Sequence, residues 1–173
     1  TAEDAQARFS DQAAVLADEG VDMFIIETAF DLNMALAALK GIRSVTNTPV
    51  ACTMTFKETP KGFFTIFGNP PAESMKTLAG EGACIVGANC AMGSDTMIRL
   101  AGEIREAVDI PVMIQPNAGL PQAGPGQTVS YPESRDFFAD NIMKIKDLGI
   151  DIVGGCCGTT PDYIRTIKNR LNS

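Results

Sequence analysis

The stretch "CIVGANCAMGSDTMIRLAGEIREAV" (residues 84–108) joins a short apolar run to a longer amphipathic one. Residues 84–90 are apolar and bounded by turn-forming residues, which is typical of a buried strand. Residues 94–108 repeat their apolar side chains every three or four positions, which predicts a helix with one buried face. A buried strand followed by such a helix is the repeating unit of a parallel α/β fold.

The same unit recurs on both sides of this stretch. Further buried strands are predicted at 22–28, 49–56, 111–117 and 150–156, and helical patterns at 2–19, 31–45 and 134–149. Apolar strands that alternate with helices imply a parallel sheet covered by helices, either doubly wound or closed into a barrel. The strands begin roughly 30 residues apart, near the repeat of a barrel of about 250 residues divided by eight.

Five predicted strands are too few to close an eight-stranded barrel. The helical pattern at 2–19 also has no predicted strand before it. We therefore expect an α/β fold in which residues 1–173 form the C-terminal five strand-helix units of a (β/α)8 TIM barrel, a truncated barrel.

The amino-acid composition limits the kinds of molecule that this protein is expected to bind. The formal net charge of −7 argues against a nucleic-acid surface, and no run of residues is long and apolar enough for a membrane span. Five cysteines without a visible export signal predict reduced thiols and a cytoplasmic location. Histidine is absent, so we expect a small-molecule partner and chemistry based on sulfur, carboxylates or a metal.

Polar residues stand where the predicted strands end, which is where the active sites of such barrels lie. In chain order these strand ends carry Glu27 and Thr28, Thr53 and Thr55, Asn89 and Cys90, Gln115 and Asn117, and Cys156 and Cys157. Because the carboxyl ends of parallel strands meet at one edge, these side chains are expected to converge on one mouth.

Three of these residues are cysteines, namely Cys90, Cys156 and Cys157. Three thiolates from two strand ends form the incomplete tetrahedron of a catalytic zinc ion, which keeps its fourth position open. In "GGCCGTTP" (154–161), Thr159 or Thr160 would cap the next helix, with Pro161 at its first position. The positive end of that helix would favour ionised thiolates.

Each of these residues also has a purely structural interpretation. Cys52 and Cys84 lie inside apolar runs and fit small core residues, and Cys90 taken alone would fit the same role. Glu27 could cap a helix or form an ion pair, and Asn117 could be a turn residue.

Four segments together resemble a known family. "GANCAMG" (87–93), "QPNAGLP" (115–121) and "GGCCGTTPDYI" (154–164) resemble the homocysteine S-methyltransferase family, and are closest to the homocysteine-binding barrel domain of cobalamin-dependent methionine synthases. "DMFIIETAFDLNMALAAL" (22–39) resembles the fourth strand and helix of that barrel.

The resemblance implies a role for seven residues. Cys90, Cys156 and Cys157 would ligate one Zn2+ ion. Glu27 would bind the amino group of the substrate, with Thr28 beside it, and Asn89 and Asn117 would line the same mouth. Residues 1–173 would be the C-terminal part of the homocysteine-binding barrel domain, without the first three strands of the family and without a folate-binding or cobalamin-binding module.

The implied reaction is transfer of a methyl group to the thiol of L-homocysteine, which gives methionine. A zinc-bound thiol is deprotonated outright, so no histidine base is required. The expected donor is methylcobalamin, within a methylcobalamin and methyltetrahydrofolate system, bound by another domain or protein; betaine and S-methylmethionine are alternative donors. Two other classes stay open, a thiol redox or selenium-handling enzyme that uses Cys156 and Cys157, and an inactive zinc-binding fragment. This chain alone is expected to be inactive.

Overall fold

The computed structural model describes residues 1–124, 126 and 128–172. Its main sheet contains five parallel strands in the order β1-β2-β5-β6-β9. These strands are β1 (Phe24–Ala29), β2 (Val50–Met54), β5 (Ile85–Gly93), β6 (Val112–Asn117) and β9 (Ile152–Val153). Their spatial order follows the chain, as in the wall of a barrel, whereas the order of a doubly wound sheet reverses at a switch point.

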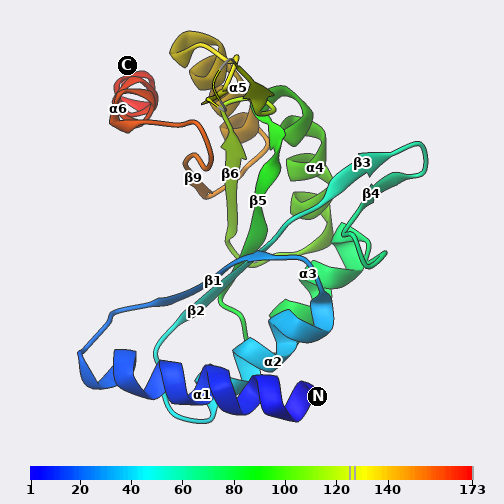
Figure 1. Cartoon of the computed structure of the whole chain (residues 1–173), viewed down its shortest axis with the longest axis vertical. Helices are drawn as coiled ribbons and strands as arrows, with labels where there is room; N and C mark the ends of the chain where they lie inside the picture. The colour runs from blue at the N-terminus through cyan, green and yellow to red at the C-terminus, as the bar shows by residue number, and fades with distance from the viewer. Residues whose placement is uncertain (125, 127, 173) are drawn as a thin grey trace.

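Helices connect these strands and cover the outside of the curved sheet (Figure 1). They are α1 (Ala2–Asp18), α2 (Leu32–Arg43), α3 (Pro71–Gly80), α4 (Ser94–Ala107), α5 (Arg135–Asp147) and α6 (Pro161–Leu171). Thr1, Asp31 and Ser134 cap α1, α2 and α5 through their side chains, whereas α3 and α6 begin with proline. None of the described helices has the length and apolarity that a membrane crossing requires.

The core lies between the sheet and these helices. Alternate strand residues point outward into it, including Val50, Cys52 and Met54 of β2. They pack against buried helix residues such as Leu39, Leu78, Leu100, Ile104, Phe138 and Ile142. This layer positions the strand ends that carry the polar residues.

Helix α1 docks closely on α2 at Gly41. A Cβ atom at position 41 would lie 2.6 Å from the carbonyl oxygen of Gln6, so only glycine permits this approach. The contact fixes α1 beside β1, and the two elements enclose a groove.

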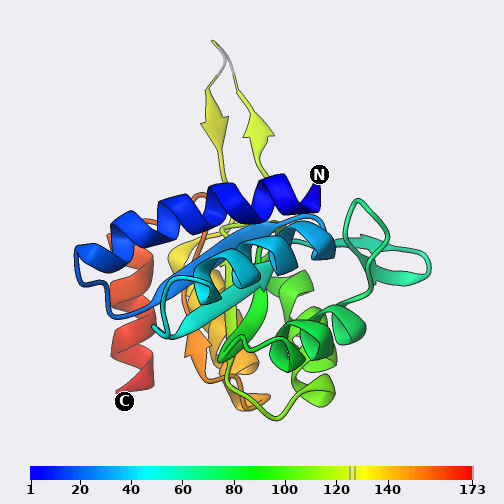
Figure 2. The same cartoon turned by 90° about the horizontal axis from the view of Figure 1, so that it is seen from below.

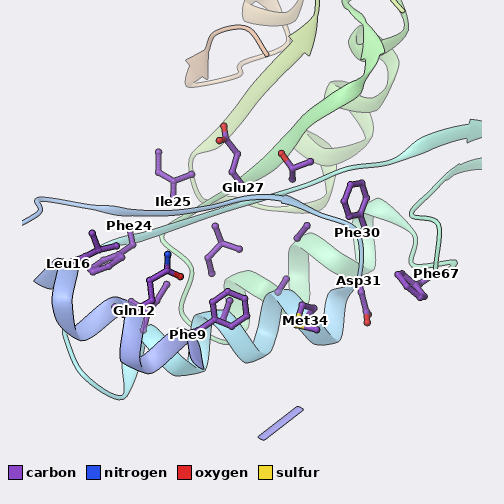
Figure 3. A pocket seen from close by; sticks show the side chains of 17 residues that line it. Phe9, Gln12, Leu16, Phe24, Ile25, Glu27, Phe30, Asp31, Met34 and Phe67 are labelled. Atoms are coloured by element: carbon purple, nitrogen blue, oxygen red, sulfur yellow. The ribbon is translucent and has the colours of Figure 1, made fainter. Parts of the chain in front are cut away.

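The sheet is open at β1. Within the described residues β1 pairs with β2 and has no partner strand on its other edge. Ile25 is 47% exposed there, although in a closed barrel its side chain would be covered. A groove of about 470 Å³ lies between α1, β1 and α2, lined by apolar side chains that include Phe9, Leu16, Phe24 and Met34 (Figure 3).

Two short hairpins lie outside the predicted elements. They are β3 (Lys57–Thr59) with β4 (Gly62–Phe64), and β7 (Gln122–Ala123) with β8 (Val129–Ser130). Strands β7 and β8 extend away from the body of the protein (Figure 2). The predicted strand at 150–156 is shorter than expected, because β9 contains only Ile152 and Val153.

Candidate metal and substrate site

The three predicted ligand sulfurs lie together at the carboxyl end of the sheet. Cys90 Sγ is 3.7 Å from Cys157 Sγ, and Cys156 Sγ is 3.9 Å from Cys157 Sγ. All three sulfurs lie within 4.8 Å of one another. A tetrahedral zinc ion with Zn–S distances of about 2.3 Å would separate its sulfurs by about 3.8 Å. The spacing and the soft donor set therefore fit zinc.

An unusual backbone conformation places Cys90. The φ angles of Cys90 and Ala91 are 65° and 60°, in the left-handed region that residues other than glycine rarely adopt. Between Asn89 and Gly93 the pairing of β5 with β6 shifts in register. The strand thus bends at Cys90 and directs its thiol toward Cys157. Left-handed conformations of this kind cost about 1–3 kcal/mol each, so the surrounding structure must hold them.

The loop after β9 is held against the end of β6. Cys156 N donates to the carbonyl of Pro116 at 2.8 Å, and Cys157 N donates to Asn117 Oδ1 at 3.0 Å. The carbonyl of Cys157 accepts from Ala118 N at 2.9 Å. The side chain of Asn117 thus fixes the backbone of a predicted metal ligand.

The helix cap after this loop differs from the prediction. Thr160 occupies the N-cap position of α6 but its side chain makes no capping hydrogen bond. The Thr159 hydroxyl instead donates to the carbonyl of Cys156 at 2.7 Å. This threonine therefore tightens the cysteine turn and leaves the helix end uncapped by a side chain.

Burial outweighs the expected effect of the helix end on Cys156. Desolvation, followed by the charges of Cys90 and Cys157, raises the pKa of the Cys156 thiol to about 12. Without a metal this sulfur is a protonated thiol at neutral pH. Burial likewise raises the pKa of Cys52 to about 12, in keeping with its place in the core.

Asn89 links three strands at the mouth. Its Oδ1 accepts from Thr28 N at 2.9 Å and from Thr53 Oγ1 at 2.8 Å. Its Nδ2 donates to Thr28 Oγ1 at 2.7 Å and lies 3.9 Å from Cys156 Sγ. Asn89 is fully buried, so both ends of its amide are paired within the protein.

Glu27 lies on the exposed edge strand β1 and is itself exposed. Figure 3 shows its side chain, like that of Ile25, on the opposite side of β1 from Phe9, Phe24 and Leu16. Glu27 is thus at the rim of the groove, which it helps to line, and its side chain lies on the other face of β1 from these apolar residues. The N-cap of α2 is Asp31, and no ion pair joins Glu27 to any cation among the described residues. Neither structural interpretation of Glu27 holds within the described residues.

Tyr131 is a neighbour of the cysteine turn that the sequence did not indicate. Its ring packs against Gly158, the residue after Cys157, because a Cβ atom at position 158 would lie 2.2 Å from Tyr131 Cγ. Desolvation, with Cys157 as the second cause, raises the pKa of Tyr131, so the phenol keeps its proton at neutral pH. Tyr131 follows the short strand β8 in a segment without periodicity, and no sequence signal placed it beside the cysteines.

The chain that carries this thiol cluster is similar in sequence to a known family. Residues 1–171 match the family model described as homocysteine S-methyltransferase. The chain belongs to the homocysteine S-methyltransferase family. Its relatives include the proteins named methionine synthase in Mycobacterium leprae and Mycobacterium tuberculosis, which are 32% and 31% identical to it over 165 residues. These matches cover 92% of this chain but only 13% and 14% of those relatives.

Solved structures from this family show the same fold. The apo form of the homocysteine methyltransferase MmuM from Escherichia coli superposes with a TM-score of 0.79 at 20% identity, over 98% of this chain and 57% of that one. Its metallated form superposes with a TM-score of 0.78 at 21% identity, over 98% of this chain and 52% of that one. The five parallel strands and their helices thus have the arrangement of a homocysteine methyltransferase.

Proposed function

We propose that this chain supplies the zinc site for transfer of a methyl group to the thiol of L-homocysteine, with methionine as the product. The observation that carries the proposal is the cluster of Cys90, Cys156 and Cys157, whose sulfurs lie within 4.8 Å of one another at the mouth of the sheet. Membership of the homocysteine S-methyltransferase family supports it.

The three cysteines would hold one Zn2+ ion and leave a fourth position for the substrate sulfur. A bound zinc ion would lower the pKa of the homocysteine thiol and so supply a thiolate at neutral pH. The protein's own residues divide the remaining work. Asn117 orients the backbone of Cys157, and Asn89 holds the ends of β1 and β5 together.

Glu27 is the residue that we assign to recognition of the substrate. Its carboxylate is exposed at the mouth side of β1 and would accept hydrogen bonds from the ammonium group of homocysteine. Thr28 follows it and is fixed by Asn89, so the position of Glu27 is tied to the strand that carries Cys90. Further contacts from Thr28, Asn89 and Asn117 to the substrate are part of the same proposal.

We further propose that residues 1–173 are the C-terminal part of a homocysteine-binding (β/α)8 barrel domain. The open edge of β1 and the apolar groove beside it support this domain assignment, since another strand would cover both. The chain alone would then lack one wall of the substrate pocket and be inactive. It spans about one seventh of the methionine synthases that it matches, so the activity of a whole protein is part of the proposal.

Methylcobalamin, on a cobalamin-binding module of another domain or protein, is the methyl donor that we propose. The support is the wording of the three motifs and the higher identity to methionine synthases than to MmuM. Betaine and S-methylmethionine are the alternative donors.

Metal analysis of the purified chain tests the zinc site. The chain should bind one zinc ion, and alanine at any one of Cys90, Cys156 and Cys157 should abolish tight binding. Cys52→Ala and Cys84→Ala are matched controls that should keep the metal, because these residues lie within or beside the core. Full zinc in a Cys156→Ala, Cys157→Ala double variant would refute the ligand assignment.

A second measurement separates the function classes. A redox enzyme would show a titratable disulfide between Cys156 and Cys157 and no bound metal. A methyltransferase site would instead bind homocysteine at the metal and, when joined to the rest of its barrel, convert homocysteine to methionine with methylcobalamin. Zinc binding without methionine formation in that complete barrel would favour the inactive zinc-binding fragment.

A further inference from the structure

Glu133 is bound through its side chain to the end of the strand that carries Cys90. Its carboxylate accepts two hydrogen bonds from Ser94, one from the backbone nitrogen at 3.0 Å and one from the hydroxyl at 2.5 Å. Ser94 is fully buried and is the first residue of α4, directly after β5. The carboxylate therefore fixes the point at which β5 passes into α4.

The backbone of Glu133 is bound to the other cysteine-bearing segment. Its nitrogen donates to the carbonyl of Ala118 at 3.1 Å, and Ala118 N donates to the carbonyl of Cys157 at 2.9 Å. The hydroxyl of Tyr163, in the helix that follows the cysteine turn, donates to the carbonyl of Glu133 at 2.6 Å. Glu133 thus connects the beginning of α4 with the turn that carries Cys157.

The segment that carries Cys90 lies between two fixed points. Residues 90–92, which we call the Cys90 segment, lie between Asn89 and Gly93, where the pairing of β5 with β6 shifts in register. Cys90 and Ala91 both have positive φ angles. Such conformations persist only where the surrounding structure imposes them.

Both ends of the Cys90 segment are held from other parts of the chain. At its beginning, Asn89 is held by the hydrogen bonds to β1 and β2 described above. At its end, Gly93 lies directly against Glu133, because a Cβ atom at position 93 would be 2.4 Å from Glu133 Oε1. Glycine at this position therefore allows the carboxylate to reach Ser94.

We propose that Glu133 is a positioning residue for the metal site, whose carboxylate holds the end of the Cys90 segment so that the Cys90 sulfur stays beside those of Cys156 and Cys157. Without this carboxylate, residues 90–92 would relax toward ordinary backbone conformations and move the Cys90 sulfur away from the other two. Fewer molecules would then be ready to bind the metal, and the apparent affinity falls in proportion to that fraction. The inference rests on the proposed zinc site and adds to it a residue that is not itself a ligand.

Three variants separate this role from a general effect on stability. Glu133→Ala removes both acceptors of Ser94 but leaves the backbone hydrogen bonds to Ala118 and Tyr163 in place. Glu133→Gln keeps one oxygen that can accept from Ser94 N. Asn141→Ala is the matched control, because the buried Asn141 Nδ2 donates to the same Ser94 hydroxyl at 3.0 Å, and its loss leaves both bonds to the carboxylate intact.

The first measurement requires no metal. The metal-free chain is treated with iodoacetamide, in which a cysteine sulfur attacks the methylene carbon and iodide leaves with the bonding electrons, and peptide mass spectrometry gives the rate at each cysteine. In Glu133→Ala the half-buried Cys90 should be alkylated about tenfold faster, the order of effect of losing hydrogen bonds to a charged group. In Asn141→Ala its rate should be unaltered. Cys52 lies in the core and reports global unfolding, so its rate should change alike in both variants.

The second measurement is the zinc affinity, obtained by competition with a chromophoric chelator. Glu133→Ala should bind zinc about tenfold more weakly than the unaltered chain, for the same lost hydrogen bonds. Glu133→Gln should lie between the two, because it restores one of the two acceptors. Asn141→Ala should keep the unaltered affinity.

Two results would overturn the inference and leave the zinc site in place. One is a Cys90 alkylation rate or a zinc affinity in Glu133→Ala that stays within about twofold of the unaltered value. The other is an equal change in Asn141→Ala, because lost stability would then explain the effect without any role in placing Cys90. An unaltered chain that binds no zinc would instead refute the proposed function, and with it this role for Glu133.

Discussion

Thr28 and Asn89 hold each other through two reciprocal hydrogen bonds. Thr28 N donates to Asn89 Oδ1 at 2.9 Å, and Asn89 Nδ2 donates to Thr28 Oγ1 at 2.7 Å. Thr28 has a φ of 61° and follows Glu27, whereas Asn89 precedes the equally left-handed Cys90. The pair therefore joins the proposed substrate-binding strand to the proposed metal-binding strand, across β2.

Removing this pair should damage both halves of the site. Asn89→Ala leaves the buried Thr53 hydroxyl and the Thr28 backbone without their acceptor, so the free energy of unfolding should fall by about 1–3 kcal/mol. Urea denaturation measures this change, and zinc titration should show weaker binding. Asn169→Ala on the exposed face of α6 is the control and should leave both quantities unchanged. Full stability in Asn89→Ala would mean that the network does not hold the strained residues.

Glu27→Gln should weaken homocysteine binding and leave zinc in place. The substitution removes the negative charge that would pair with the substrate ammonium, and loss of a charge-assisted contact corresponds to about a tenfold or larger decrease in affinity. Calorimetry of homocysteine binding to the zinc-loaded complete barrel provides the measurement. Glu19→Gln, at the exposed end of α1, is the control. An unchanged affinity together with a full complement of zinc would exclude Glu27 from the substrate site.

Zinc affinity should fall steeply as pH decreases. The pKa of Cys156 in the metal-free protein is raised to about 12, so zinc must displace a proton from this thiol at any pH below that value. Each unit of decrease in pH should therefore cost about tenfold in apparent affinity from Cys156 alone. Competition with a chromophoric chelator between about pH 6 and pH 8 measures the slope. An affinity independent of pH in this range would show that Cys156 is not a ligand.

The open edge of β1 should make the isolated chain associate. Unpaired backbone groups on β1 and the half-exposed Ile25 offer a template for pairing with another strand. Ile25→Lys places a charge on this edge and should shift the chain toward the monomer in sedimentation analysis. Val45→Lys, at an exposed position after α2, is the control. A chain that is monomeric, and active with methylcobalamin at about 1 per second or faster, would contradict the proposed domain assignment.

Much of this architecture could be predicted from the sequence. Strands β2 and β6 lie within the predicted apolar runs, and β1 and β5 overlap theirs but end one and three residues later. The agreement arises because buried parallel strands need little besides apolar side chains. The meeting of Cys90 with Cys156 and Cys157 followed from the same reasoning, since parallel strands end at one edge. The local hydrophobic pattern and the shared direction of the parallel strands were sufficient to predict these features.

Other features depend on contacts that no local pattern records. The hairpins β3-β4 and β7-β8 have strands of only two or three residues, which are too short for a periodic hydrophobic signal. The left-handed conformation at Cys90 and Ala91 could not be predicted, because neither residue is a glycine. The ring of Tyr131 packs against the turn that follows the cysteines only because Gly158 leaves room for it. The positive end of α6 was expected to lower the pKa of Cys156. That prediction was wrong, because burial of the thiol raises its pKa.

The shortness of β9 gives the metal a mechanical role as well. Ladder pairing joins β9 to β6 only at Ile152 and Val153, and the two cysteines follow a few residues later. An ion shared with Cys90 would cross-link β9 to β5 over the intervening strand and close one covalent ring through α4, β6 and α5. Closing so long a ring restricts the unfolded chain far more than the folded one. Removal of the metal with a chelator should therefore speed amide hydrogen exchange in β9 and α6 first and leave β1 and β2 protected. Bound metal would in this way stabilise the C-terminal edge of the sheet.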